Sequence, residues 1–153
     1  RQTGSAPPCS SKANPVPPSH EMTTAQEFGC EKCFPSEAEA AYRAFPGLSS
    51  VAGLIDESHF IVRVVACAHC GQHYVSVFTE LIDWKDGDDS QDRIVLPLTE
   101  QESAELVAQG ERVDVRRIQA LGENRRSLTI THPCGGTLSI RWWRGKLLVM
   151  PHD

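Results

Sequence analysis

Four of the six cysteines in this chain of 153 residues form two pairs with the spacing C-x-x-C. The first pair is Cys30 and Cys33, and the second is Cys67 and Cys70. One C-x-x-C turn presents two sulfur atoms to a single ion, and four thiolates complete the tetrahedral shell that Zn²⁺ prefers. The spacing therefore predicts one structural zinc ion, held by all four of these cysteines.

Cysteines can also form disulfides, and a C-x-x-C that opens a helix can act as a redox dithiol. Cys30 follows a polar stretch, however, and the second pair lies between two strand-like runs. The N-terminal residues lack the apolar core of a secretory signal, and no apolar run is long enough to cross a bilayer. We therefore expect reduced, metal-binding thiols in the cytoplasm and no membrane contact.

The second pair continues as Cys70-Gly71, and residues 34–66 separate the two pairs. This arrangement resembles a zinc ribbon, in which two cysteine knuckles face each other across the metal. The resemblance covers only the knuckles and the strands around the second pair. The chain departs from the commonest ribbon pattern because no glycine follows Cys33 and no obvious strand precedes Cys30. The resemblance implies a metal site, and it implies no single activity because zinc ribbons serve many processes.

Two histidines, His69 and His73, lie in or beside the second knuckle, where either could replace a cysteine ligand. We expect both to lie next to the site without binding the metal. His132 and Cys134 suggest a second chemistry, a nucleophile with its base, and Cys134 could also be an alternative zinc ligand. Their spacing in a strand-to-turn segment does not show contact, so we expect Cys134 to fill a hairpin turn.

Charge is distributed unevenly along the chain, whose formal net charge is −5. Nine acidic residues and two basic residues lie between Glu80 and Glu105. In the acidic loop 83–92, a calcium-binding EF-hand that starts at Asp86 would need glycine at its sixth position, where this chain has Gln91. Eight basic residues and three acidic residues lie between Glu111 and Lys146. With one exposed tryptophan from the pair Trp142-Trp143, this second region could bind single-stranded nucleic acid. Solvated faces are the simpler interpretation of both regions.

The elements that must position these residues follow from local patterns. The predicted strands are 60–65, 74–79, 113–121, 127–132, 137–143 and 147–150, and the predicted helices are 37–45 and 100–109. The first helix would have Ser36 as its N-cap, and the second would have Thr99 and Glu102 as a capping box, with Gly110 as its C-terminal stop. Short turns between consecutive strands predict an α+β fold, with a small antiparallel sheet meander, two short helices and a zinc-knuckle hairpin.

The N-terminal stretch is rich in proline, serine and threonine, so residues 1–27 are predicted to be a disordered tail and Cys9 a bystander. Residues 28–153 are predicted to form a single zinc-binding domain. Because four thiolates leave no open position on the metal, we expect a non-catalytic interaction or accessory module with a protein partner that the sequence does not identify. A nucleic-acid-binding protein that uses the basic region 112–146 is the alternative, and a Cys/His enzyme is the third hypothesis.

Overall fold

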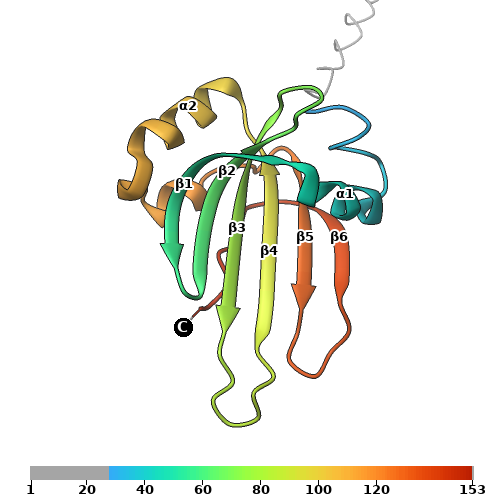
Figure 1. Cartoon of the computed structure of the whole chain (residues 1–153), viewed down its shortest axis with the longest axis vertical. Coiled ribbons are helices and arrows are strands. Elements are labelled where there is room, and N and C mark those ends of the chain that lie inside the picture. Colours follow the sequence, from blue (N-terminus) through green and yellow to red (C-terminus); the bar gives the residue numbers. More distant parts are fainter. Residues whose placement is uncertain (1–27, 153) are drawn as a thin grey trace, which may run out of the picture.

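The structure is a computed structural model that describes residues 28–152 of the chain. The predicted disordered tail, with Cys9, lies outside the described residues and stays a prediction. The described part confirms the predicted class, because six antiparallel strands form an open sheet in the order β1-β2-β3-β4-β5-β6 (Figure 1). In chain order, the elements are α1 (Ala38–Ala44), the 3₁₀ turn η1 (Phe45–Gly47), β1 (Ser49–Glu57), β2 (Phe60–Ala66), β3 (His73–Leu81), β4 (Ser90–Pro97), α2 (Glu100–Gln109), η2 (Gly110–Arg112), α3 (Val115–Gln119), β5 (Arg126–His132) and β6 (Ser139–Arg144).

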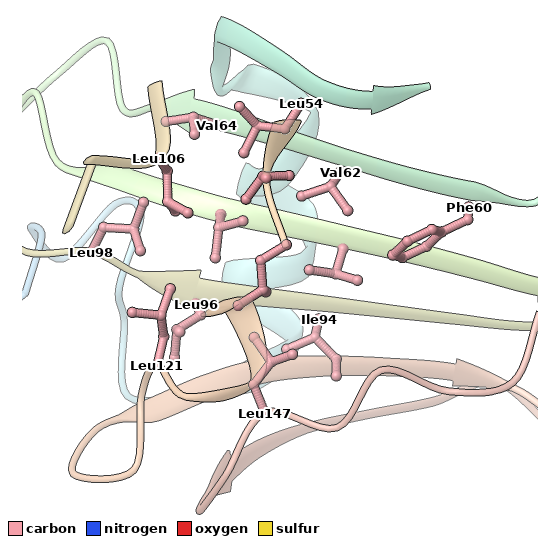
Figure 2. Close-up of a cluster of buried hydrophobic side chains, with 14 residues drawn as sticks. Leu54, Phe60, Val62, Val64, Ile94, Leu96, Leu98, Leu106, Leu121 and Leu147 are labelled. Carbon is pink, nitrogen blue, oxygen red and sulfur yellow. The ribbon is translucent and has the colours of Figure 1, made fainter. Parts of the chain in front are cut away.

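A hydrophobic core covers the first face of the sheet, because alternate side chains of a strand point to opposite faces. Val62, Val75 and Leu96 point from neighbouring strands into this core, where Leu106 of α2 and Ile118 of α3 cover them. Figure 2 shows the core side chains gathered between the strands and the segments that cross them. This first core fixes α2 against β1, β2 and β3.

A second core covers the opposite face of the sheet, and it contains two of the four predicted ligands, Cys33 and Cys67. Val95 and Leu128 supply its centre from β4 and β5, and Ala41 of α1 packs against it. Helix α1 contacts β5 and β6, near the right-hand edge of the sheet in Figure 1. The cysteine region is therefore an integral part of the packing on this face.

Helix α2 has the boundaries that the sequence predicts. The backbone N–H of Glu102 donates to Thr99 Oγ1 at 3.2 Å, and the backbone N–H of Thr99 donates to a carboxylate oxygen of Glu102 at 2.9 Å. These two bonds form the predicted capping box, and Gly110 follows the last residue of the helix. Arg125 also donates to both carboxylate oxygens of Glu102, at 2.6 and 2.8 Å, which connects the start of α2 to the beginning of β5.

Two predicted strands are wrong. Segment 113–121 contains α3, which begins after Asp114 because the Oδ1 atom of that residue accepts from the backbone N–H of Arg116 at 2.9 Å. Segment 147–150 belongs to no strand of the described sheet. Its Leu147 is buried in the first core, and His152 then stacks on Phe60 with ring centroids 4.2 Å apart. The C-terminal segment thus returns across the first face to β2 (Figure 1).

Other boundaries differ from the sequence predictions in detail. Strand β1 lies in a stretch that was expected to be a loop, and shifts in its pairing with β2 interrupt the alternation that identifies a strand. The predicted loop 83–92 ends early because β4 begins at Ser90. The N-cap residue of α1 is Glu37 instead of Ser36, and its side chain makes no capping hydrogen bond. Within residues 28–152, no helix has the length and apolar character needed to span a bilayer.

Candidate metal centre

The first cysteine knuckle is a tight turn that precedes α1. The backbone N–H groups of Cys33 and Phe34 both donate to the carbonyl oxygen of Cys30, at 3.2 and 2.8 Å. This turn places the sulfur atoms of Cys30 and Cys33 3.8 Å apart. Both side chains of the pair therefore point to the same side of the turn, as ligands of one ion must.

The second knuckle is the tip of the hairpin that β2 and β3 form, as the sequence predicts. The N–H of Gly71 donates to the carbonyl oxygen of Cys67 at 2.8 Å, and the N–H of Cys67 donates to that of Gln72 at 2.9 Å. Gly71 has a φ of +78°, a left-handed conformation that glycine adopts without strain. The register of β2 and β3 therefore determines where the second pair of sulfur atoms lies.

The structure brings all four predicted ligands together. The sulfur atoms of Cys30, Cys33, Cys67 and Cys70 lie within 4.8 Å of one another, and Cys33 Sγ is 3.6 Å from Cys70 Sγ. A zinc–sulfur bond of about 2.3 Å in a regular tetrahedron requires sulfur atoms separated by about 3.8 Å. The arrangement can thus hold a tetrahedral metal ion that prefers thiolates.

Tyr74 contributes a hydrogen-bond donor to this centre. Its buried hydroxyl group donates to Cys33 Sγ at 3.0 Å, and the backbone N–H of Cys30 donates to the same sulfur at 3.4 Å. Burial, together with the hydrogen bond to Cys33, raises the pKa of Tyr74 well above its usual range, so the hydroxyl group keeps its proton. Donors of this kind stabilise thiolate charge and orient the ligand.

The cysteines differ in their protonation when no metal is bound. Burial raises the pKa of Cys33 to about 12, whereas the backbone N–H of Cys33 lowers the pKa of Cys30 to about 7. A metal ion that binds all four sulfurs must therefore displace the proton of the Cys33 thiol. A metal ion that binds here would therefore release protons, and its affinity would fall as the solution becomes acidic.

Gly29 allows the first knuckle to approach the second. It has a φ of +70°, and a Cβ atom at this position would lie 2.5 Å from Tyr74 Oη and 2.8 Å from Cys33 Sγ. Its N–H donates to Gln72 Oε1 at 3.1 Å. The side-chain amide nitrogen Nε2 of Gln72 donates to the backbone carbonyl oxygens of His73 and Leu98, both at 2.7 Å. Gln72 therefore ties the first knuckle to the hairpin and to the start of α2.

Arg126 of β5 holds the segment that follows the first knuckle. Its guanidinium group donates to the carbonyl oxygens of Phe34 and Pro35, at 3.0 and 2.8 Å. It also lies 4.2 Å from the ring centroids of both Phe34 and Trp142.

Four residues of the centre could not be identified from the sequence patterns considered above, namely Gly29, Gln72, Tyr74 and Arg126. The glycine before Cys30 was a local signal, but the other three act through contacts that only the folded chain creates.

The histidines beside the second knuckle do not join the sulfur cluster. His69 is exposed, and His73 Nδ1 lies 2.6 Å from the hydroxyl oxygen of Ser103 in α2. His73 therefore connects the hairpin to the helix, and the expectation that neither histidine binds the metal stays a prediction.

Cys134 and His132 lie far from the cysteine cluster, because the β5–β6 turn packs against the β3–β4 loop at the other end of the sheet (Figure 1). The Cys134 thiol is exposed and lies 3.8 Å from Asp83 Oδ2. Desolvation and the nearby carboxylates of Asp88 and Asp83 raise the pKa of Cys134. An activated nucleophile needs a lowered pKa, so this environment does not favour the enzyme hypothesis.

Several basic side chains of region 112–146 are engaged within the chain. Arg117 pairs with Glu105, Arg125 pairs with Glu102, and Arg126 is covered by aromatic rings. Trp142 packs against the second core, whereas Trp143 is 42% exposed and has Arg141 over its ring. The pair thus has one inward and one outward tryptophan, as predicted, but fewer arginines remain available for a phosphate backbone.

No protein-family model, curated protein or solved structure matches this chain. The cluster of four cysteines, suited to holding a metal ion, is therefore the feature that supports a function.

Proposed function

We propose that this chain is a zinc-stabilised, non-catalytic interaction module in which Cys30, Cys33, Cys67 and Cys70 hold one structural Zn²⁺. The observation that carries the proposal is the clustering of these four sulfur atoms at separations that suit a tetrahedral zinc–thiolate centre. Four thiolates fill the coordination shell, so the metal has no position for a substrate.

The metal would act on folding through the two segments that it joins. Cys33 and Cys67 are buried in the second core, so the ion crosslinks the first knuckle to the β2–β3 hairpin inside that core. Because an unfolded chain has no assembled site, the free energy of metal binding adds to the free energy of unfolding. Reduced thiols also suit a reducing compartment, which supports the proposal of a cytoplasmic protein.

Elemental analysis of the untagged protein tests this proposal, together with thermal melts before and after chelation. We expect one zinc per chain and a large loss of stability when zinc is removed. Iron also binds to four thiolates, so one iron per chain in place of zinc would overturn the choice of metal. A metal-free protein with a stable fold would overturn the structural role and favour thiol or disulfide chemistry.

Cysteine variants separate the metal effect from a general effect of losing a thiol. Cys70→Ser should remove the metal or unfold the domain, whereas Cys134→Ser should keep the zinc content and melting temperature, because Cys134 lies at the other end of the sheet. A Cys67→Ser, Cys70→Ser double variant with an unchanged melting profile would contradict the proposal.

A further inference from the structure

Two arginines lie near Ser76 on the second face of the sheet, outside the cluster of four cysteines. Arg63 of β2 pairs directly with Ser76 in the β2–β3 register, and Arg93 of β4 donates from Nη1 to Ser76 Oγ at 3.0 Å. Helix α1 contacts β5 and β6 at one edge of the sheet. The Arg63 side chain is half exposed and Arg93 is partly exposed, so solvent can reach both residues.

Aromatic side chains hold the guanidinium group of Arg93 in place. Its central carbon lies 4.9 Å from the ring centroid of Phe78 and 5.0 Å from that of Phe45 in η1. A guanidinium group binds aromatic rings with its faces and directs its five N–H donors outward in its own plane. Contact with two rings therefore fixes the orientation of the group and leaves its edge for an acceptor.

The positive charge of this pair is poorly compensated within the chain. Among residues 28–152, no ion pair includes Arg93, and its recorded side-chain hydrogen bond is the one to Ser76. Arg63 has one acidic neighbour, Asp56, at 3.7 Å, and the Asp56 side chain is 79% exposed. Burial, and secondarily the charge of Arg63, lowers the pKa of Arg93, as expected for two cations placed near each other.

The packing of η1 on the sheet explains why Arg93 is present, but it does not explain why a second arginine lies near it. The contacts of Arg93 with Phe45 and Phe78 attach η1 to the sheet, and this attachment needs a single guanidinium group. The second cation near it adds repulsion, and among residues 28–152 Arg63 lies over no aromatic ring. An anion that accepts from both groups would relieve the repulsion and occupy the unused donors.

We propose that Arg63 and Arg93 form a binding site for an oxyanion group, either a carboxylate or a phosphate. Both groups match the planar, two-pronged donor edge of a guanidinium. Phe78 and Ile61, which pair across β2 and β3, are half-buried apolar neighbours of the site. The site therefore suits an oxyanion attached to an aromatic or aliphatic group better than a fully hydrated ion. The inference does not depend on the identity of the metal.

Titration of the full-length, metal-loaded protein followed by NMR of the arginine Nε–H resonances tests the site. The probes are inorganic phosphate, phenyl phosphate and benzoate, with sodium chloride at equal ionic strength as the reference. We expect saturable shifts of the Arg63 and Arg93 resonances and tighter binding of phenyl phosphate or benzoate than of inorganic phosphate. The order of affinity for phenyl phosphate and benzoate shows whether phosphate or carboxylate is preferred.

Variants connect the binding to these two side chains. Arg63→Gln, at a half-exposed position, should retain the fold and weaken binding by about tenfold, because it removes one charge-assisted partner. Arg93→Gln should weaken binding at least as much. Arg116→Gln, at an exposed position on α3, should leave the affinity unchanged. Shifts that merely follow ionic strength, or equal affinities for Arg63→Gln and Arg116→Gln, would overturn the proposal.

Discussion

At the residue scale, the metal centre depends on close approach as much as on its four ligands. Gly29, Tyr74 and Cys33 meet so closely that a single added carbon atom at residue 29 has no space. The cysteine spacing made the cluster of four sulfur atoms predictable from sequence, because C-x-x-C is a local pattern. The contact of Gln72 with Gly29 and that of Arg126 with Phe34 join residues 43 and 92 positions apart, so no local pattern could show them.

Gly29→Ala tests this close packing, with Gly71→Ala as its control. Both glycines have positive φ values, +70° and +78°, so both variants carry a similar backbone cost of about 1 kcal/mol. A Cβ atom at residue 71 meets no other atom within 4 Å, whereas one at residue 29 collides with Tyr74 and Cys33. We expect the Gly29→Ala variant to have a lower free energy of unfolding and a lower zinc affinity than the Gly71→Ala variant. Equal values from denaturant melts and zinc competition would contradict the packing argument.

Tyr74→Phe isolates the hydrogen bond to the Cys33 sulfur. The ring remains in the second core, so the loss of the donor is the main change. We expect zinc affinity to fall by about 10- to 100-fold, as for other partners of metal ligands. Competition with a chromophoric chelator measures this, and Tyr42→Phe on the exposed side of α1 is the matched control. An unchanged affinity for Tyr74→Phe would show that this donor is dispensable.

At the scale of elements, local signals identified α2 because its capping box and final glycine lie within a few residues of the helix. Strand β1 was missed because its two irregularities shift the side-chain alternation. Segment 113–121 was assigned to a strand because its β-branched residues are typical of strands. The cap at Asp114 and the burial of Ile118 in the first core favour a helix there instead.

The ion pair between Glu102 and Arg125 predicts how stability depends on pH. Burial alone would raise the pKa of Glu102, but hydrogen bonds from Arg125 and from the backbone N–H of Thr99 outweigh it and lower the pKa. Because the folded-state pKa is below the unfolded one, the pair stabilises the fold above the unfolded pKa. This stabilisation is lost as pH falls through the folded pKa.

Glu102→Gln should therefore destabilise the protein by about 1–3 kcal/mol near neutral pH, since it leaves Arg125 without a charged partner in a largely buried place. The difference from the wild type should shrink as the solution is acidified below the pKa of an ordinary glutamate. Glu105→Gln is the control, because the pair of Glu105 with Arg117 is exposed and should contribute less. Urea melts at several pH values measure the free energy of unfolding of both proteins. A difference between wild type and Glu102→Gln that stays constant as the pH falls would contradict this prediction.

At the scale of the whole molecule, one sheet carries two separate cores, and the metal centre belongs to the second. The sequence predicted the meander and its order because short turns connect most strands. It did not predict how the C-terminal segment crosses the first face, since an apolar run such as 147–150 resembles a strand. Leu147 belongs to no strand of the described sheet, and its side chain packs into the first core (Figure 2). The surface on which it packs exists only when the sheet is complete.

Leu147→Ala measures how strongly this segment closes the first core. Leu147 is 2% exposed, so its truncation should lower the free energy of unfolding by about 2–5 kcal/mol. The adjacent Leu148 is 58% exposed, and Leu148→Ala should change stability by less than about 0.5 kcal/mol. Similar effects of the two substitutions in denaturant melts would show that the segment does not pack as described.

The meander also determines the order in which parts of the protein become complete during synthesis. Within residues 28–152, each strand pairs with strands that neighbour it in the sequence, so the hairpins β1–β2, β2–β3, β3–β4 and β5–β6 can each form from a short stretch of nascent chain. All four ligands are present once Cys70 has left the ribosome, before α2 and the second half of the sheet exist. A metal ion bound by these cysteines would therefore be able to join the first knuckle to the segment after β2 early in synthesis, whereas the Arg126 contacts and the C-terminal segment can form only when translation is nearly finished.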